Sequence, residues 1–276
     1  MKALKTPLRY PGGKSRATKY LLPRFPEKIT EFRESFLGGG SVAIAFSKAN
    51  PDIPVWVNDL YEPLYNFWCE LRDNAAELSS RLEELKSSNP EPVSAKQLFL
   101  DSKEILNGTQ GDQSNLSRAC AFYIVNKCSF SGLTESSSFS KQASESNFSM
   151  RGIDKLPAYQ VIIKDWKITK DSYERLLTDD KGVFIYHDPP YDIKDNLYGK
   201  KGDLHKRFDH DKFSVDCDNH VARQMISYNS TQMVKDRFKD WLACTYDLTY
   251  TMRSTGDYMN EQKDRAELLL TNYETV

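Results

Sequence analysis

Apolar runs and polar breaks alternate along both ends of the chain in a way that predicts strands followed by helices. Runs of β-branched and aromatic residues that end in Gly, Asn or Asp predict buried strands at 32–37, 55–57 and 183–186. Helical spacing is found at 16–25, 42–46 and 62–72. Ser41 is the expected N-cap of the second of these helices. Such alternation is typical of an α/β sheet with parallel strands.

The middle of the chain breaks this alternation. Residues 74–127 have a helical pattern throughout, and the serine-rich segment 129–150 has neither helical nor strand period. Alternation resumes at 159–163, which we interpret as a strand ending at Asp165-Trp166, with a helix at 167–177 after it. Further strands are predicted near 223–228, 244–252 and 266–272, the last two as an antiparallel hairpin.

A helical insertion that splits one sheet explains this order of elements. We therefore predict an α/β protein with a doubly wound, Rossmann-like sheet, and a length of 276 residues suits one large domain with an insertion. The expected boundaries place the first part of the catalytic and cofactor domain at 1–73, the insertion at 74–155 and the second part at 156–276.

Composition narrows the class of protein. Hydrophobic residues make up 39% of the chain and charged residues 28%, and no apolar run approaches the roughly 20 residues that span a bilayer. The amino terminus lacks the apolar core of a secretion signal, so we expect a cytoplasmic protein that is not attached to a membrane. The five cysteines are scattered without a C-x-x-C pair, and no metal site is predicted.

Charge is uneven along the chain although the net charge is only −1. Residues 1–33 carry nine Lys or Arg against two acidic residues. Such a block is either a solvated face or a surface that contacts the phosphates of a nucleic acid.

The segment from the first strand to Asp59 is typical of a nucleotide site. Gly38-Gly39-Gly40 joins a strand to a helix, and Asp59 follows the next strand 19 positions after Gly40, where a carboxylate binds ribose hydroxyls. The third spaced glycine of a dinucleotide site is absent, which favours a smaller adenosine ligand over NAD. Gly12-Gly13-Lys14-Ser15 lacks the first glycine of a P-loop, because Leu8 stands there.

A second site follows the strand at 183–186, where the chain reads Asp188-Pro189-Pro190-Tyr191. Prolines have no N–H, so this turn offers carbonyl and carboxylate acceptors that suit a substrate amine with two hydrogens. Tyr191 offers a ring on which a base can stack. The alternative is that Asp188 caps a helix and Tyr191 is ordinary packing.

Together these segments resemble the Dam-like family of DNA adenine N6-methyltransferases, which use S-adenosylmethionine. The likeness runs in sequence order through 8–14, 34–42, Asn58-Asp59, 188–191, 227–230 and 265–273. It implies a Rossmann-like methyltransferase sheet with an inserted helical target-recognition domain. Catalysis would then belong to Asp188, Pro189, Pro190 and Tyr191. The implied cofactor-binding residues are Tyr10, Pro11, Gly12, Gly13, Lys14, Glu34, Phe36, Gly38, Gly39, Gly40, Ser41, Asp59, Asp165 and Trp166.

The resemblance also implies that double-stranded DNA is the partner and that the target adenine is flipped out of the duplex. The segment 130–135 lacks the arginine with which family members read their site, so recognition of GATC is not expected. Residues expected to contact DNA are Arg9, Lys14, Arg118, Lys127, Ser131, Lys141 and Arg151. We expect a monomer or a weak dimer. Methylation of cytosine N4 or of RNA, and a catalytically silent DNA-binding relative, are the alternatives.

Overall fold

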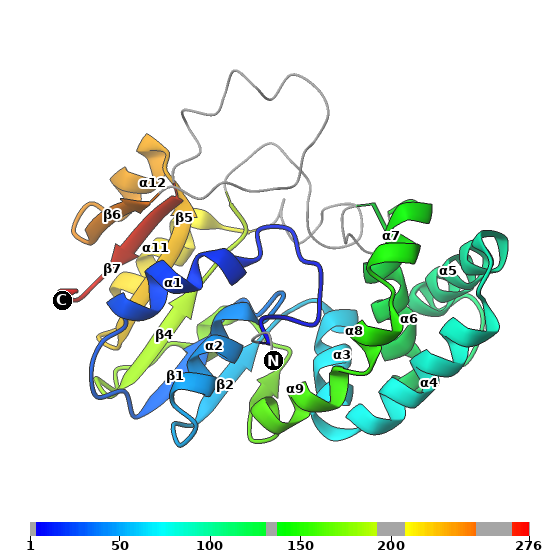
Figure 1. Ribbon diagram of the computed structural model, residues 1–276. Helices are drawn as coiled ribbons and strands as arrows, with labels where there is room; N and C mark the ends of the chain where they lie inside the picture. Colours follow the sequence, from blue (N-terminus) through cyan, green and yellow to red (C-terminus); the bar gives the residue numbers. More distant parts are fainter. Residues whose placement is uncertain (1–3, 131–136, 192–207, 247–266, 276) are drawn as a thin grey trace.

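The computed structural model describes residues 4–130, 137–191, 208–246 and 267–275. A seven-stranded sheet with the order β3-β2-β1-β4-β5-β7-β6 forms its centre (Figure 1). The strands are β1 (Glu31–Glu34), β2 (Val55–Asn58), β3 (Lys167–Thr169), β4 (Val183–His187), β5 (Arg223–Asn229), β6 (Leu242–Tyr246) and β7 (Glu267–Thr271). Strands β1 to β5 run parallel to one another, and β7 is antiparallel to both β5 and β6.

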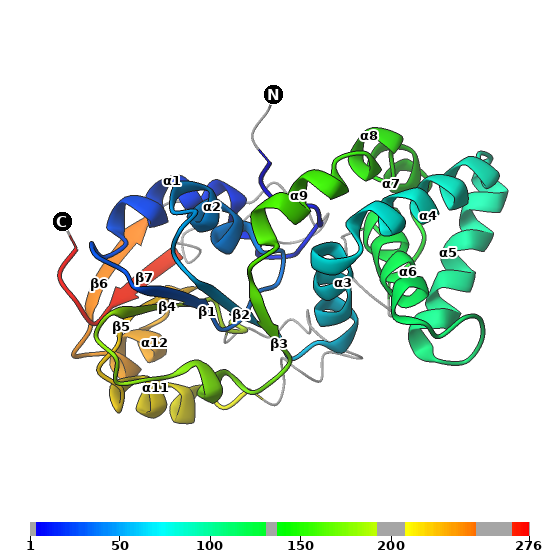
Figure 2. The ribbon, with the colours of Figure 1, turned by 90° about the horizontal axis from the view of Figure 1, so that it is seen from below.

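Helices cover both faces of the sheet, which explains why its central strands are apolar along their whole length. Every residue of β4 is buried, as expected for a parallel strand with helices above and below it. Helices α1 (Thr18–Leu21) and α2 (Ser41–Ala49) lie on one face, and α11 (His210–Asp218) and α12 (Gln232–Arg237) lie on the other (Figure 2).

The helical insertion lies beside the β3 edge of the sheet (Figure 2). Its helices are α4 (Ala75–Ser88), α5 (Pro92–Asn107), α6 (Asn115–Cys128), α7 (Lys141–Ser146) and α8 (Met150–Ile153). Helix α3 (Glu62–Asp73) leads into the insertion and α9 (Leu156–Ile163) leads out of it. Leu82, Phe99 and Phe122 of the insertion belong to the same hydrophobic cluster as Phe32 of the sheet. The insertion and the sheet therefore share one continuous core.

The α/β class, the strands near 32–37, 55–57, 183–186 and 223–228, and the helix at 62–72 are confirmed. The last two strands do pair antiparallel, as β6 and β7. Of the predicted strand at 244–252, residues 247–252 lie outside the described part of the chain.

Three local predictions are wrong. Residues 159–163 belong to helix α9, and the strand follows at 167–169, where a helix was expected. Five residues of alternation fit a helix with one buried face equally well. The helix expected at 16–25 is broken into α1 and two short 3₁₀ turns, the second of which contains Pro23. The N-cap of α2 is Gly40, and Ser41 is the first residue of the helix.

Candidate active site

The candidate site lies where the sheet order reverses, between β1 and β4. Strand β1 pairs with β2 on one side and with β4 on the other, with Glu34 opposite Val57 and Tyr186. The carboxyl ends of these three strands therefore meet at one edge of the sheet. Ligands of open α/β sheets bind at such a switch point. Glu34, Asp59 and Asp188, which lie far apart in the sequence, are brought together by this topology.

A cavity opens at this edge, with about 820 Å³ of empty space that includes part of the open solvent. The cavity is lined both by segments expected to bind the cofactor and by the segment expected to bind the target base. The lining residues are Tyr10, Pro11, Gly12, Gly13, Lys14, Glu34, Phe36, Leu37, Gly38, Gly39, Ser41, Asp59, Leu60, Tyr61, Asp188, Pro190 and Phe208. Leu37, Leu60, Tyr61 and Phe208 were not predicted, because neutral and apolar wall residues carry no sequence pattern of their own.

The glycine turn approaches its neighbours too closely for any side chain. Gly38 and Gly40 have φ angles of +48° and +65°, in the left-handed region that favours glycine. A Cβ on Gly38 would lie 2.9 Å from the ring of Tyr10, and one on Gly40 would lie 2.7 Å from the ring of Trp68. Gly38 and Gly39 line the cavity. Gly40 does not line it and instead supports the turn from behind.

Two carboxylates of the cavity accept hydrogen bonds from backbone N–H groups. Asp59 accepts from Gly38 at 2.8 Å and from Tyr61 at 3.0 Å. Burial raises the pKa of Asp59 to about 6, and these two hydrogen bonds oppose the shift. Glu34 accepts from the N–H of Ala43 at 2.8 Å, at the start of α2, and burial raises its pKa well above the usual value. Each of these bonded carboxylate oxygens has a second lone pair, which these backbone N–H groups do not use.

Asp188 forms an ion pair with Lys14, whose side chain is only 3% exposed. The ammonium donates to both carboxylate oxygens, at 2.7 and 2.8 Å. Burial raises the pKa of Asp188 to about 6, while Lys14 and the nearby hydroxyl of Tyr191 oppose the rise. Burial lowers the pKa of Lys14, but the charges of Asp188, Glu267 and Glu34 outweigh it and leave that pKa raised. Lys14 therefore stays charged beside the predicted catalytic carboxylate.

Tyr191 does not line the cavity but lies directly behind Asp188. Its hydroxyl donates to Oε2 of Glu267 at 2.6 Å. Its ring is stacked on Tyr228 with 5.8 Å between the centroids, and the Lys14 ammonium lies 5.0 Å from the ring centre. Sequence reasoning marked the segments 227–230 and 265–273 but assigned no role to Tyr228 or Glu267.

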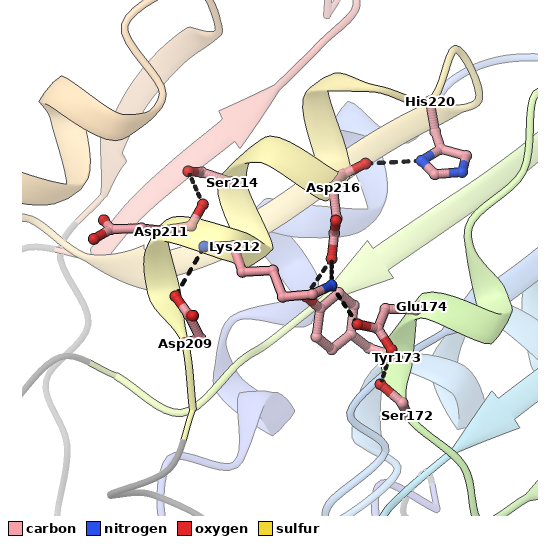
Figure 3. Close-up of polar contacts among 9 residues, drawn as sticks. All are labelled: Ser172, Tyr173, Glu174, Asp209, Asp211, Lys212, Ser214, Asp216 and His220. Carbon is pink, nitrogen blue, oxygen red and sulfur yellow. Dashed lines mark hydrogen bonds and ion pairs between the residues drawn. The ribbon is translucent and has the colours of Figure 1, made fainter.

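An aromatic wall closes the cavity on the side of α11. Phe36 is stacked on Tyr173 at 5.9 Å and meets Phe208 edge to face at 5.6 Å. Behind this wall, the Tyr173 hydroxyl donates to Asp216 at 2.7 Å, and Lys212 bridges Asp216 and Glu174 (Figure 3). These polar contacts tie α11 to the turn after β3, so they hold the wall in place.

Asp165 and Trp166 do not line the cavity, which contradicts their expected place beside the cofactor. The side chain of Asp165 is 87% exposed, and the indole of Trp166 is buried and donates to Ser47 at 2.8 Å. Both residues precede β3, so they lie at the opposite end of that strand from the site. Asp171 follows β3 instead, and its N–H donates to Asn58 at 2.9 Å, next to Asp59. The strand was predicted too early in the sequence, which is why Asp165 was expected at the site.

Three of the basic residues expected at DNA are held by the protein itself, and one of them is Lys14 in its ion pair with Asp188. The guanidinium of Arg9 donates to the carbonyl oxygens of Ser129 at 2.7 Å and Phe130 at 3.0 Å. Arg118 pairs with Glu62 at the start of α3. These contacts join the amino-terminal segment and α3 to α6, which gives both arginines a structural role.

The other predicted DNA contacts differ in exposure. Lys127 packs over the ring of Tyr123, and burial lowers its pKa to about 8. Lys141 and Arg151 are exposed on α7 and α8. Ser131 lies outside the described residues. Of the aromatic residues in the serine-rich segment, Phe148 is buried, whereas Phe130 is 69% exposed.

Two other kinds of feature are absent from the described ranges. No group of three or more His, Cys, Asp or Glu side chains there is placed to hold a metal ion. No helix of that part combines the length and the apolar character needed to cross a membrane.

Comparisons with known proteins agree with this geometry. The family model of the D12 class N6 adenine-specific DNA methyltransferases matches residues 10–253. The type II methyltransferase M1.LlaDCHI of Lactococcus lactis subsp. cremoris is 23% identical over 96% of this chain and 94% of its own length. The modification methylase StsI of Streptococcus sanguinis is 23% identical over 99% of this chain, which spans 44% of that enzyme. The chain belongs to the D12 class of N6 adenine-specific DNA methyltransferases.

Proposed function

We propose that the cavity holds S-adenosylmethionine and that Asp188 presents to it the N6 amine of a flipped adenine in duplex DNA. One observation carries this proposal: the glycine turn with Asp59, and Asp188 with Pro190, line the same cavity. A methyl donor and an amine have to meet in line for direct transfer, and one shared cavity permits that. Site-specific adenine methylation is also the activity of the family to which the chain belongs.

The residues of the cavity fit an adenosine ligand with a positive charge. The turn at Gly38 leaves no room for a Cβ, so a ligand there lies against bare backbone. Asp59 has lone pairs for ribose hydroxyls, and the ionised Asp188 in the same cavity favours a cation. We assign the adenine end to the neighbourhood of Phe36 and Leu60, which line the cavity, in place of Asp165 and Trp166. When bound, S-adenosylmethionine supplies an electrophilic methyl group.

The acceptors of the tetrapeptide then orient the amine. Asp188 and the carbonyl of Pro189 each accept one hydrogen of the exocyclic amine, which turns its lone pair toward the methyl group. Lys14 holds Asp188 by one lone pair on each oxygen and leaves the others for the substrate. Its positive charge also keeps Asp188 ionised, and therefore able to accept. Asp188 takes up the amine proton after transfer.

The target base has to leave the duplex to reach this cavity, at a cost of a few kcal/mol. We propose that the half-buried ring of Tyr191, supported by the buried ring of Tyr228, supplies the stacking surface that offsets this cost. On the insertion, the exposed side chains of Lys141, Arg151 and Phe130 are the proposed DNA contacts. The residues at 1–73 and 156–276 then form the catalytic domain, and 74–155 the target-recognition domain.

The test uses the whole protein, radiolabelled S-adenosylmethionine and unmethylated plasmid DNA. We expect label in the DNA, and digestion to nucleosides should identify N6-methyladenine. Label in cytosine or in RNA would favour the alternative substrates, and absence of label with retained DNA binding would favour a silent relative. Sequencing of the modified positions would then define the recognition site. Because its substrates are in the cytoplasm, we place the protein there.

A further inference from the structure

Glu267 is a buried carboxylate on the base side of the cavity. Strand β7 runs antiparallel to β5 with Glu267 opposite Asn229, the last residue of β5. The first residue of β7 therefore lies at the edge where the parallel strands end, next to the tetrapeptide. The side chain of Glu267 is 3% exposed. A carboxylate this buried is stable only with hydrogen-bond donors.

Tyr191 supplies one such donor from a segment 76 positions away. Its hydroxyl donates to Glu267 at 2.6 Å, a length typical of a strong bond to a charged acceptor. The same hydroxyl also contributes to lowering the pKa of Asp188, so it lies close to that carboxylate. Tyr228 stacks on the ring. A tyrosine in a loop turns about two side-chain torsions. A bond at its hydroxyl fixes the first torsion, and stacking on Tyr228 limits rotation of the ring about the second.

We propose that Glu267 is a positioning residue for the target base, because it holds the Tyr191 hydroxyl and so fixes the ring beside Asp188. This inference rests on the proposed function of the cavity. Glu267 acts through Tyr191 and does not touch the base. The opposing view is that Glu267 only completes the polar edge of the sheet, in which case loss of the Tyr191 hydroxyl has no effect on turnover.

A double-mutant cycle separates these views. Tyr191→Phe removes the donor and keeps the ring, Glu267→Leu removes the acceptor, and Glu267→Gln keeps an acceptor oxygen. We measure kcat and KM for methylation of plasmid DNA, and the dissociation constant of S-adenosylmethionine. Each of Tyr191→Phe and Glu267→Leu should lower kcat about tenfold, and the double variant should also lose only about tenfold. Glu267→Gln should recover most of the rate, and cofactor affinity should stay within about twofold of the wild type.

Tyr159→Phe in α9 is the matched control, since it removes a tyrosine hydroxyl remote from the cavity and should leave kcat unchanged. A Tyr191→Phe variant with the wild-type rate, or a double variant that loses about a hundredfold, overturns the inference. If Glu267→Leu does not fold, Tyr191→Phe combined with Glu267→Gln decides, and a loss clearly beyond that of Tyr191→Phe alone contradicts it. A wild-type protein that transfers no methyl group would instead overturn the proposed function.

Discussion

The two sides of the cavity are built in different ways. On the cofactor side, one segment from Glu34 to Tyr61 supplies the groups, and their carboxylates bond to backbone N–H groups within about 21 positions. On the base side, Lys14 bonds Asp188 across 174 positions and Tyr191 bonds Glu267 across 76, in both cases between side chains. Backbone contacts hold the cofactor side rigid, whereas the base side depends on single side chains. Substitutions should therefore affect the two sides separately.

The largest expected effect is on the base side. Asp188→Ala should lower methyl transfer at least about 10³-fold, because it removes the acceptor that orients the amine. The dissociation constant of S-adenosylmethionine, measured by calorimetry, should change by less than about threefold. A variant that loses cofactor affinity and turnover together would show that the two sides are not separable.

Gly40→Ala should destabilise the cofactor side through its backbone. The left-handed φ costs roughly 1–2 kcal/mol for alanine, and contact with Trp68 adds about 1–3 kcal/mol. Gly108→Ala is the matched control, because Gly108 has a similar φ of +70° and nothing within 4 Å of an added Cβ. Urea unfolding gives the free energy of unfolding of both variants. An equal loss in the two would show that the contact with Trp68 does not contribute.

Asp59→Ala should weaken the binding of S-adenosylmethionine by about ten- to a hundredfold, since hydrogen bonds to a charged group are worth about 1.5–3 kcal/mol. Turnover at saturating cofactor should fall much less. Asp52→Ala, at an exposed carboxylate, is the control. An unchanged dissociation constant for Asp59→Ala would exclude Asp59 from the site.

The ion pair predicts the pH dependence of the base side. Asp188 accepts hydrogen bonds only when ionised, so kcat/KM should fall as the pH drops through about 6. Lys14 opposes the effect of burial on this pKa, so Lys14→Met should move the acid limb to higher pH. Lys14→Arg should keep the wild-type profile. An acid limb at the same pH in Lys14→Met would show that Lys14 does not act on Asp188.

The smallest effect is expected on the insertion, far from either side of the cavity. Lys141→Ala and Arg151→Ala should each raise KM for plasmid DNA about two- to threefold and reduce its dependence on salt. Lys96→Ala, at an exposed lysine of α5, is the control and should change neither. Equal effects of all three substitutions would mean that the insertion attracts DNA only through its overall charge.

Much of this protein follows from its sequence alone. The strands at 55–57 and 183–186, the glycine turn and the acids Asp59 and Asp188 were predicted because strand ends, turns and acidic residues have local signals. The segment 156–169 was misread because five alternating residues fit a helix and a strand alike, and that error placed Asp165 at the carboxyl end of a strand, where the structure does not have it.

Only the tertiary structure decided which partners the charged residues take. Arg9 and Arg118 were expected to contact DNA because they are basic, yet both bond to other residues of the protein. Tyr191 meets Glu267 because the sheet order brings the ends of β4 and β5 beside the start of β7. Lys14 meets Asp188 because the 3₁₀ turn before α1 packs over the end of β4. Such pairs depend on the packing of distant strands, and no local pattern of residues determines that packing.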